Sequence, residues 1–384
     1  MPAASLAPTS PVPRPRKILV RGVNWLGDSV MTTPALQRLR EALPETQITL
    51  LTPEKLAGLW EHHPSVNEVI TFRREETALQ IGRRLREGNF DAALVLPNSP
   101  RSAIEVFLAA IPRRIGYARP WRNFFLTQRV PPRPEAVSMH RRPVAEIKRI
   151  LTLATPPRAE VIPAGAHQSG EYLHLAATLG ARREPLPPHV VVTQVEVQAL
   201  KRRFNILPEA GEARPWLGLS PGAEYGPAKR WPPARYVAAA MELGQRARCR
   251  WLLVGGPAEV ELATRMAAEI RGEVMNLAGQ TTLRELCAAL KMCAVVLTND
   301  SGPMHVAAAV GTPVVALFGS TSPELTGPGL PGDVRHRLLK GNAACAPCYR
   351  RECPIDFRCM QGISVEGVVE AVLRTLQQQG RREA

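Results

Sequence analysis

The stretch Arg21–Ala35 reads RGVNWLGDSVMTTPA and follows the short apolar run KILVR at residues 17–21. The apolar run is typical of a buried parallel strand, and the stretch leads into a helical pattern. Gly22 and Gly27 allow the backbone to turn tightly between the two and to approach a ligand closely. A strand, a glycine-containing turn and a helix form one unit of a doubly wound α/β sheet. Because the turn lacks the GxGxxG spacing, it does not indicate dinucleotide binding.

Asp28 lies in this turn, before a helix that we predict at Thr33–Leu43 with Pro34 in its first turn. A carboxylate that points into a ligand cleft from such a turn could remove a proton from an attacking hydroxyl. An aspartate at the start of a helix is equally expected as an N-cap. The residues alone leave both interpretations open.

Strand and helix patterns alternate along the chain in two tandem series. In the first, strands are predicted at 17–21, 47–52, 68–72 and 92–96 and helices at 33–43, 56–62 and 76–87. In the second, strands are predicted at 216–220, 251–255, 274–276, 294–298 and 313–318 and helices at 235–247, 259–271, 283–291, 303–310 and 364–379. A stretch rich in proline and alanine, 154–188, separates them and contains one predicted helix near 171–179. The pattern predicts two doubly wound parallel sheets with ligands in the cleft between them.

The first sixteen residues contain five prolines and no apolar run, so we expect a disordered extension and not a signal peptide. No apolar run in the chain reaches the roughly 18 residues that span a bilayer. The length of 384 residues exceeds one ordinary core and agrees with two domains. We therefore expect a cytoplasmic protein.

A loop suited to phosphate follows the predicted strand 216–220. Ser220–Trp231 reads SPGAEYGPAKRW, in which prolines and glycines fix an irregular turn and Lys229 and Arg230 offer cationic donors. With the amides at the start of the next helix, these groups suit a diphosphate. An ordinary exposed loop is the alternative. Glu224 either reaches a sugar hydroxyl or is simply solvated.

The sequence NDSG at residues 299–302 forms a similar loop directly after the predicted strand AVVLT. The groups that can hold an anion at the start of the following helix are Asp300, Ser301 and the amides of Gly302 and Met304. His305 lies one turn further along, where a structural role is at least as well supported as a chemical one.

The segment Val254–Glu261, VGGPAEVE, places Glu259 and Glu261 at the start of a helix that follows a strand. One carboxylate at such a position could accept hydrogen bonds from both hydroxyls of a ribose. On the residues alone, a solvated glutamate favoured by the helix dipole is the better-supported interpretation.

The formal net charge of +15 is unevenly distributed, since residues 101–149 hold 11 basic and 3 acidic residues. Such a surface favours a polyanion: nucleic acid, anionic lipid headgroups or a phosphorylated glycolipid. A site for single-stranded nucleic acid interleaves aromatic with basic residues. Aromatic residues form only 5% of the chain and cluster near the basic stretch only at Trp121, Phe124 and Phe125, so nucleic acid ranks low as a partner.

Four of the seven cysteines, Cys345, Cys348, Cys353 and Cys359, lie within fifteen residues. This is not the pattern of a secreted disulfide scaffold, and the spacing suits a tetrahedral Zn²⁺. A redox pair, an iron–sulfur site and four reduced thiols are the alternatives. We expect the cluster to hold the C-terminal tail and to take no part in the chemistry.

Taken together, these segments resemble the lipopolysaccharide heptosyltransferases, inverting glycosyltransferases of the GT-B architecture, in which two Rossmann-like domains face each other across a cleft. In the second half, the resemblance rests on PGAEYGPAKRWP (221–232), NLAGQTTL (276–283) and TNDSGPMHVAAAVGTPVVALFGSTSP (298–323). In the first half, it rests on NWLGDSVMTTPAL (24–36), VLPNSPRSA (95–103) and IPRRIGYAR (111–119). It extends over about residues 17–330 and is strongest to the branch of the family that adds the second heptose.

The resemblance implies transfer of L-glycero-D-manno-heptose from ADP-heptose onto the first heptose of Kdo-lipid A, with inversion and without a catalytic metal. It makes Asp28 the catalytic base and Lys229 the cation that neutralises the leaving diphosphate. It makes Glu261 the ribose ligand, although the residues alone favour a solvated glutamate there. It also places Thr281 at the adenine pocket. The whole implied donor-binding set is Glu224, Lys229, Glu261, Thr281, Asp300, Ser301, Gly302, Met304 and His305.

The resemblance also assigns roles to the domains. Residues 17–190 become the acceptor-binding domain, residues 191–363 the donor-binding domain with the cysteine cluster at 345–359, and residues 364–384 a helix that crosses back to the N-terminal domain. Phosphates and Kdo carboxylates of the acceptor, at the cytoplasmic face of the inner membrane, give the basic stretch a partner and make the enzyme a peripheral one. The candidate acceptor-binding residues are Asn24, Arg101, Arg113, Arg114, Arg119 and Arg122.

Two alternatives remain. A glycosyltransferase of the same architecture could use another nucleotide sugar or act at another position of the core. A zinc-containing nucleic-acid-binding protein is the more distant alternative.

Overall fold

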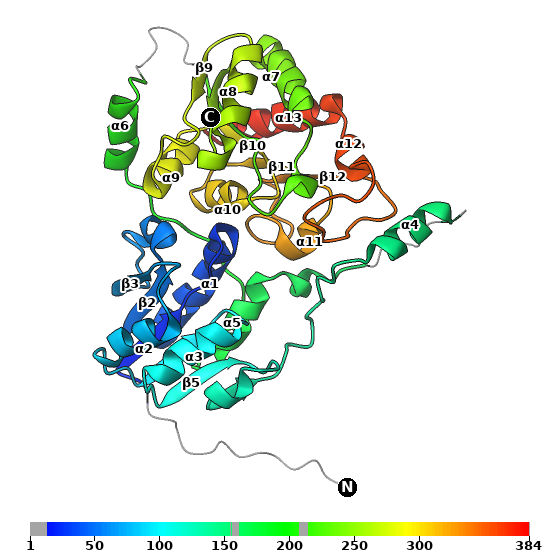
Figure 1. Cartoon of the computed structure of the whole chain (residues 1–384). Coiled ribbons are helices and arrows are strands. Elements are labelled where there is room, and N and C mark those ends of the chain that lie inside the picture. Colours follow the sequence, from blue (N-terminus) through cyan, green and yellow to red (C-terminus); the bar gives the residue numbers. More distant parts are fainter. Residues whose placement is uncertain (1–13, 154, 156–160, 207–213, 384) are drawn as a thin grey trace.

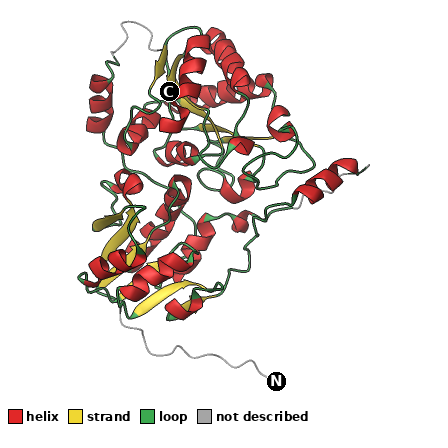
Figure 2. Cartoon of the chain, viewed as in Figure 1, coloured by secondary structure: helices red, strands yellow, loops and turns green. Residues whose placement is uncertain are grey.

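The computed structural model describes residues 14–153, 155, 161–206 and 214–383. They form two α/β domains, which Figure 1 shows as two lobes, with the N-terminal lobe in blue to green and the C-terminal lobe in green to red. In each lobe, helices lie on both sides of one parallel sheet (Figure 2). Most of the predicted extension, residues 1–13, lies outside the described residues. The amide of Arg16 already donates to Asp91 at 2.7 Å, so the end of that segment belongs to the first domain.

The N-terminal domain contains the first six strands. Its elements in chain order are β1 (Lys17–Arg21), α1 (Leu26–Ala42), β2 (Gln47–Pro53), η1 (Glu54–Trp60), β3 (Glu68–Phe72), α2 (Ala78–Arg86), β4 (Ala92–Val95), α3 (Pro100–Leu108), β5 (Arg113–Tyr117), η2 (Asn123–Phe125), β6 (Gln128–Val130), α4 (Val144–Thr152), η3 (Ala164–Ala166) and α5 (Ser169–Ala177). The strands pair in parallel in the order β3-β2-β1-β4-β5-β6. The chain reverses direction between β1 and β4, which is where such sheets bind ligands.

The C-terminal domain repeats this topology. Its elements are α6 (Gln194–Arg203), β7 (Trp216–Ser220), η4 (Pro227–Lys229), α7 (Pro233–Ala247), β8 (Arg250–Leu253), η5 (Pro257–Glu259), α8 (Val260–Glu269), β9 (Val274–Asn276), α9 (Leu283–Lys291), β10 (Val295–Asn299), α10 (Gly302–Ala309), β11 (Val314–Phe318), α11 (Pro323–Thr326), β12 (Arg337–Lys340), α12 (Arg358–Gln361) and α13 (Val365–Glu383). Read as β9-β8-β7-β10-β11-β12, the strand order is that of the first sheet. The predicted fold class, two Rossmann-like domains, is confirmed.

Helix α1 begins about two turns earlier than the sequence predicts. It starts at Leu26, so Asp28 lies in its first turn and not in the turn before it. Pro34 stands inside the helix, where its missing N–H deprives the carbonyl of Val30 of its usual helical partner. The hydroxyl of Thr33 donates to that carbonyl at 2.8 Å. The threonine before the proline therefore satisfies the freed carbonyl group, and the helix continues through this position.

Several short elements have no counterpart in the prediction, namely α3, β5, β6, α4, α6 and β12. Strands β6 and β12 lie at sheet edges and contain charged or polar residues as well as apolar ones (QRV and RLLK). An edge strand is only partly buried, so it lacks the continuous apolar run that indicates a central parallel strand.

Helix α1 is packed on two sides. It contacts α5 of its own domain and α10 of the C-terminal domain. One apolar core therefore continues from the N-terminal sheet through α1 and α10 to the C-terminal sheet, with Val30 and Met304 among its members. Separate cores lie on the outer faces of the two sheets. Within the described residues, no helix combines the length and the apolar character needed to cross a bilayer.

The C-terminal helix α13 packs within its own domain. It contacts α7 and strands β10, β11 and β12. Val368, Val369 and Val372 join the core between α7 and the C-terminal sheet, on the outer face of the lobe (Figure 1). The prediction that this helix crosses back to the N-terminal domain is therefore wrong, because its apolar face is used to cover the C-terminal sheet.

The cysteine segment contacts the N-terminal half of the chain through α4. Ile147 of α4 packs with Cys345 and Cys348. The amide of Arg142 donates to the carbonyl of Cys348 at 3.0 Å, and its guanidinium donates to the carbonyl of Pro347 at 3.0 Å. The link between the halves at this place is thus made by α4 and not by α13.

Candidate active site

Two adjoining pockets lie where the carboxyl ends of the two sheets face each other. One, of about 770 Å³, is lined by the loops after β1 and β4 and by residues around the start of α5. The other, of about 400 Å³, lies between the first turn of α1 and the loops after β7 and β10. Trp25, Asp28, Met139 and Gln168 line both pockets. Asp28 is the only carboxylate among these four, so a molecule in either pocket can reach it.

A buried ion pair fixes the turn that precedes Asp28. Arg21 Nε donates to Glu105 of α3 at 2.8 Å, and both side chains are buried. Arg21 Nη1 donates to the side-chain oxygen of Asn24 at 2.9 Å. Asn24 is thereby held on the wall of the larger pocket.

Asp28 has a pKa that is raised to about 6. Burial is the largest cause because it disfavours the charged form, and repulsion from Asp300 adds to it. The positive charge of Lys229 and a hydrogen bond from Gln168 oppose the shift. The donor in that bond is Gln168 Nε2, at 3.2 Å from Asp28 Oδ1. At neutral pH the group is ionised, and it accepts a proton more readily than an exposed aspartate does.

Gln168 connects Asp28 to the C-terminal domain. Its backbone N–H donates to the carbonyl of Leu325 in α11 at 2.9 Å. The adjacent His167 is buried, and its Nε2 lies 3.0 Å from the carbonyl oxygen of Gly327. Because a carbonyl can only accept, His167 Nε2 carries the proton and donates it to this bond. The side chain that orients Asp28 is thus anchored in both domains.

Asn299, at the end of β10, holds the long loop after β7 in place. Its Nδ2 donates to the carbonyl of Pro221 at 2.7 Å, and its Oδ1 accepts from the amide of Trp231 at 3.0 Å. The indole of Trp231 is buried beneath the loop. These bonds at the two ends of the loop fix Lys229 between them.

Lys229 forms an ion pair on the wall of the smaller pocket. Its Nζ lies 2.6 Å from Asp300 Oδ2, and the hydroxyl of Thr321 donates to the same oxygen at 2.6 Å. The ammonium also lies 4.9 Å from the centre of the Tyr225 ring. Asp300 is buried and Lys229 is only 15% exposed. The site therefore holds a positive charge in a largely dry environment, beside a carboxylate that an anionic ligand can displace.

Helices α1 and α10 meet with their N-termini at the smaller pocket. A Cβ atom on Gly27 would lie 2.7 Å from the ring of His305, and one on Gly302 would lie 3.0 Å from the side chain of Leu26. A larger residue at Gly27 would force the buried ring to move, and one at Gly302 would require Leu26 to shift slightly, so glycine favours this approach. His305 is buried, and burial lowers its pKa to about 4, so the ring is neutral. The free amides of two helix starts thus face one pocket, where they favour an anion.

Comparison with known proteins identifies the family. Residues 78–357 match the model of glycosyltransferase family 9 (heptosyltransferase). The chain belongs to this family. It is 33% identical over 347 residues to lipopolysaccharide heptosyltransferase 2 of Escherichia coli strain K12, a match that covers 85% of this chain and 92% of that protein. The protein of the same name from Salmonella typhimurium is 33% identical over 323 residues, or 81% of this chain and 85% of that protein.

The architecture agrees with a solved member of family 9. The structure of E. coli ADP-heptose LPS heptosyltransferase II superposes with a TM-score of 0.73 at 28% identity, and the match covers 95% of this chain and 99% of that chain. The resemblance drawn from the sequence motifs and the GT-B architecture are both confirmed.

Most of the predicted donor-binding residues of this family 9 chain surround the smaller pocket. Those on its wall are Glu224, Lys229, Asp300, Ser301, Gly302 and His305. Met304 does not line the pocket, and its side chain is fully buried in the core, so only the amide on which the prediction rests could face a ligand. Glu261 and Thr281 do not line the pocket. The Glu261 side chain is 83% exposed and pairs with Arg265 at 3.0 Å.

Of the predicted acceptor-binding residues, Asn24 and Arg119 line the larger pocket. Arg113 and Arg114 do not, because they stand at the first residues of β5, at the end of the strand opposite to the pocket. Arg113 donates to the side chain of Gln128, and Arg114 donates to two backbone carbonyls. Both arginines stabilise the edge of the sheet.

Arg101 and Arg122 also do not line the larger pocket. Arg101 pairs with Glu105 on the same helix at 3.1 Å. Arg122 is fully buried and donates to the carbonyl of Pro97 at 2.7 Å. Since Pro97 lines the larger pocket, Arg122 supports the pocket wall from behind.

Sequence reasoning missed several residues of the two pockets, namely Trp25, Arg133, Met139, Arg141, Gln168, Tyr172, Tyr225 and Thr321. Trp25 and Tyr225 lie inside sequence motifs that are connected with the ligand cleft, so their place in those motifs could have identified them. Gln168 lies in the connection rich in proline and alanine, where no residue pattern marks it.

The four clustered cysteines, Cys345, Cys348, Cys353 and Cys359, line one small space of about 10 Å³. All four are free thiols. Burial raises the pKa of Cys359 to about 12, and the neighbouring thiols add to the shift. Among the described residues, no three of these sulfur atoms lie within 4.8 Å of one another, so the thiols surround the space without forming a closed metal site. A thiolate-binding ion would require them to move closer together.

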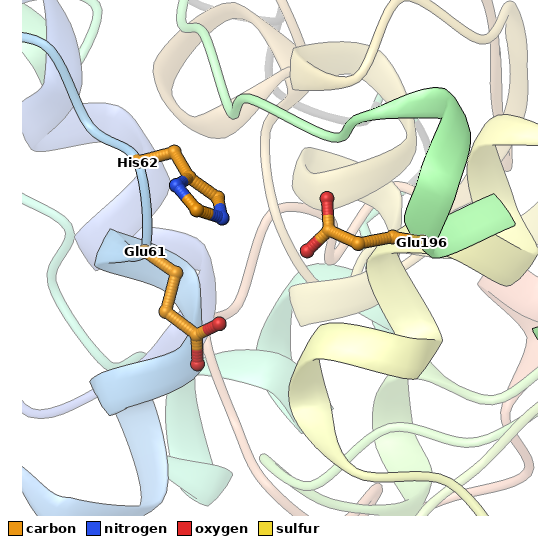
Figure 3. A group of neighbouring side chains, drawn as sticks. All are labelled: Glu61, His62 and Glu196. Atoms are coloured by element: carbon orange, nitrogen blue, oxygen red, sulfur yellow. The ribbon is translucent and has the colours of Figure 1, made fainter. Parts of the chain in front are cut away.

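A separate group of titratable side chains lies at the junction of the domains. Figure 3 shows Glu61, His62 and Glu196 pointing toward one another, with ligand atoms within 4.8 Å. Both carboxylate oxygens of Glu196 accept hydrogen bonds from Arg284, which holds the pKa of Glu196 at about 2. Because the Arg284 guanidinium already neutralises the Glu196 carboxylate, we interpret the pair Glu196–Arg284 as an ion-pair link between α6 and α9.

Proposed function

We propose that this protein is an inverting glycosyltransferase that moves L-glycero-D-manno-heptose from ADP-heptose onto the first heptose of the lipopolysaccharide inner core. The observation that carries the proposal is the position of Asp28 on the wall of both pockets, one of which has the chemistry of a diphosphate site. The curated relatives that are one-third identical to this chain are lipopolysaccharide heptosyltransferases 2. A donor and an acceptor in these pockets would meet at one carboxylate.

Asp28 is the base in this proposal. Its carboxylate takes the proton of the acceptor hydroxyl while that oxygen forms a bond to the anomeric carbon of the donor. The bond from the anomeric carbon to ADP breaks on the opposite face, ADP leaves with the electron pair, and the configuration inverts. A pKa of about 6 keeps the base ionised at neutral pH and makes it an effective proton acceptor.

Lys229 stabilises the leaving diphosphate. Negative charge grows on the phosphate as ADP leaves, and a fixed cation in a poorly solvated pocket lowers the energy of that state, so no catalytic metal is required. Lys229 pairs with Asp300 at 2.6 Å in the protein alone. Donor binding would exchange this partner for phosphate and free Asp300 to accept hydrogen bonds from the heptose hydroxyls. Ser301 and the amide of Gly302 would add donors at the start of α10.

The adenosine half of the donor would extend past the smaller pocket toward β8, which lies next to β7 in the sheet, and β9 beyond it. Glu261, in the first turn of α8, would accept the ribose hydroxyls, and Thr281 would border the adenine. The exposure of Glu261 is compatible with a ligand that lies on the surface of the C-terminal lobe.

The acceptor would occupy the larger pocket, with Asn24 and Arg119 as its polar contacts. Its phosphates and Kdo carboxylates match the basic character of this part of the chain. Since the acceptor is anchored in a lipid, the reaction would take place at the cytoplasmic face of the inner membrane, with the enzyme bound peripherally.

We also propose that the four clustered cysteines hold one structural Zn²⁺. The metal would stabilise the loop that carries Lys229, because the amide of Ala228 donates to the carbonyl of Arg351 inside the cysteine segment at 3.0 Å. Metal analysis of the purified protein should find about one zinc per chain. Cys345→Ser should lower that content, and a wild-type protein without bound metal would contradict the assignment.

The proposed function is tested by transfer assays with purified protein, ADP-heptose and lipopolysaccharide acceptors that carry no heptose or one heptose. We expect transfer to the acceptor with one heptose, inversion at the anomeric carbon by NMR, and loss of activity in Asp28→Ala. Transfer only to the heptose-free acceptor would reassign the step. Transfer from another nucleotide sugar would reassign the donor, and full activity of Asp28→Ala would refute the assigned base.

A further inference from the structure

An aromatic cluster is exposed on the N-terminal domain. Trp121 is 89% exposed, Phe124 is 77% exposed, and Phe107 of α3 is 37% exposed. The ring of Phe107 lies 6.1 Å from that of Phe124 and 5.4 Å from that of Phe125. Among the tryptophan and phenylalanine side chains that the structure describes, Trp121 and Phe124 are the most exposed. Neither is needed for the core, so the cluster requires another explanation.

The surroundings of this cluster are basic. The guanidinium of Arg114 lies 5.4 Å from the centre of the Phe107 ring, and Arg101 and Arg129 are exposed nearby in the sequence. The only acidic residue between positions 101 and 134 is Glu105. Glu105 is fully buried and is shared by Arg21 and Arg101, so it offsets part of the charge of Arg101 and leaves the charges of Arg114 and Arg129 to the surface.

The cluster borders the larger pocket. Arg119 lines that pocket, and Trp121 follows two residues later. The backbone of Trp121 has φ of +63°, a conformation that residues other than glycine rarely adopt. The neighbouring Arg122 is fully buried and donates to the carbonyl of Pro97 in the pocket wall. The segment is therefore fixed to the pocket, and its strained residue directs the most exposed indole outward.

We propose that Phe107, Trp121 and Phe124, together with Arg101, Arg114 and Arg129, form a docking surface for an anionic lipid bilayer. This inference rests on the proposed function, since an acceptor anchored in a lipid must reach the larger pocket from the membrane. Tryptophan and phenylalanine insert into the interface between headgroups and acyl chains. The arginines match anionic headgroups in charge. The enzyme would then approach the membrane with the larger pocket beside the bilayer.

The surface is tested by flotation of the full-length protein with vesicles of phosphatidylcholine, with and without phosphatidylglycerol, and without any substrate. We expect binding only to the anionic vesicles and weaker binding at raised salt. The double variant Trp121→Ser/Phe124→Ser should lower the partition coefficient by roughly tenfold or more. Arg129→Gln should lower it by roughly fivefold.

Matched controls are Val195→Ser and Val334→Ser, which remove exposed apolar side chains from the C-terminal domain and should not change binding. Trp121→Ser alone serves if the double variant is unstable, because an indole that is 89% exposed contributes little to folding. In transfer assays, the double variant should lose activity on an acceptor embedded in vesicles and keep activity on a lipid-free acceptor oligosaccharide.

Equal vesicle binding by the wild type and the double variant would overturn the proposal. A dimeric wild type and a monomeric double variant would also overturn it, since the surface would then join two copies of the chain. Tight binding of an RNA oligonucleotide that the double variant abolishes would assign the surface to nucleic acid instead. Vesicle binding is measured without donor or acceptor, so intact binding beside a failed transfer assay would contradict the proposed function alone.

Discussion

The loops after β1 and β7 occupy the same place in two sheets of the same strand order, and they present opposite charges to the cleft. After β1, a short turn leads directly into α1 and places Asp28 in the first turn of a buried helix. After β7, a long irregular loop delays α7 and brings Lys229 to the pocket wall. The topology therefore determines where a ligand meets the protein, and the length and residues of the loop determine the chemistry there.

The two loops are also held by different means. The turn after β1 is stabilised by the buried pair Arg21–Glu105, and the desolvation of Asp28 raises its pKa to about 6. The loop after β7 is held by the side chain of Asn299, and Lys229 keeps a carboxylate partner within 2.6 Å. One unit thus holds a carboxylate whose charge is disfavoured, and the other holds a cation whose charge is compensated.

The largest effect is expected when the base is neutralised. Asp28→Asn keeps the size of the side chain and removes its proton acceptor, so kcat should fall by roughly 10³-fold while ADP binding stays nearly unchanged. Asp300→Asn is the matched change in the other unit and should mainly weaken donor binding. Steady-state kinetics and calorimetry with ADP measure both. An Asp28→Asn enzyme that keeps most of its kcat would remove the proposed distinction between the two units.

A somewhat smaller effect is expected from the cation. Lys229→Met should lower kcat/KM by roughly 10²- to 10³-fold, because the growing charge on the diphosphate loses its fixed partner. The control is Lys340→Met, which removes a partly exposed lysine that pairs with Glu324 at 3.4 Å outside both pockets and should change kcat/KM little. If added Mg²⁺ is needed for wild-type activity, Lys229 is not the substitute for a metal.

The raised pKa of Asp28 also predicts a change in stability. The pKa is about 6 in the folded protein and 3.8 for an ordinary aspartate, so the ionised form destabilises the fold above both values. Asp28→Asn should therefore increase the free energy of unfolding by roughly 1–3 kcal/mol at about pH 8. The gain should shrink as the pH falls through 6 toward 3.8, because the wild-type carboxyl becomes protonated. Urea unfolding at several pH values measures it, and a gain that does not depend on pH would contradict the assigned cause.

The smallest effect is expected from Gln168, which acts through Asp28. Gln168→Leu removes a hydrogen bond that lowers the pKa of Asp28, so the acid limb of the kcat/KM profile should move from about 6 to higher pH. The rate at neutral pH should fall by roughly three- to tenfold. Tyr172→Phe is the control, since it removes another partner of Gln168 and leaves the bond to Asp28 in place. An unshifted acid limb would limit Gln168 to a structural role.

Much of the fold and part of the site follow from the sequence for a physical reason. Central parallel strands such as β7 are buried on both faces and therefore read as apolar runs. Lys229 and Asp300 belong to loops that directly follow such strands, so strand order alone predicts that they face one cleft. The edge strands β6 and β12 were missed because they lack a continuous apolar run. The start of α1 was missed because local rules do not include the hydroxyl of Thr33, which compensates for Pro34.

The acceptor side was less predictable. Local composition placed five arginines at the acceptor, but only Arg119 lines the larger pocket. Arg113 and Arg114 stand at the start of β5, whereas Arg119 lies two residues past its end, and the position of this strand is set by pairing with distant strands. Gln168 reaches Asp28 across 140 residues of sequence. No local pattern contains such a contact, because it is produced by the packing of α5 on α1.

The continuous core through α1 and α10 limits how this enzyme can be recombined. In the proposed function the two units bind different substrates, which suggests that donor and acceptor specificities could be exchanged as modules. Gly27 faces His305 and Gly302 faces Leu26, so each unit presents a surface shaped for its partner. A chimera of two relatives would need matching residues at these pairs to fold. Changes of specificity in this family are therefore expected to arise by substitutions in the loops around the pockets, while whole-domain exchange should be rare.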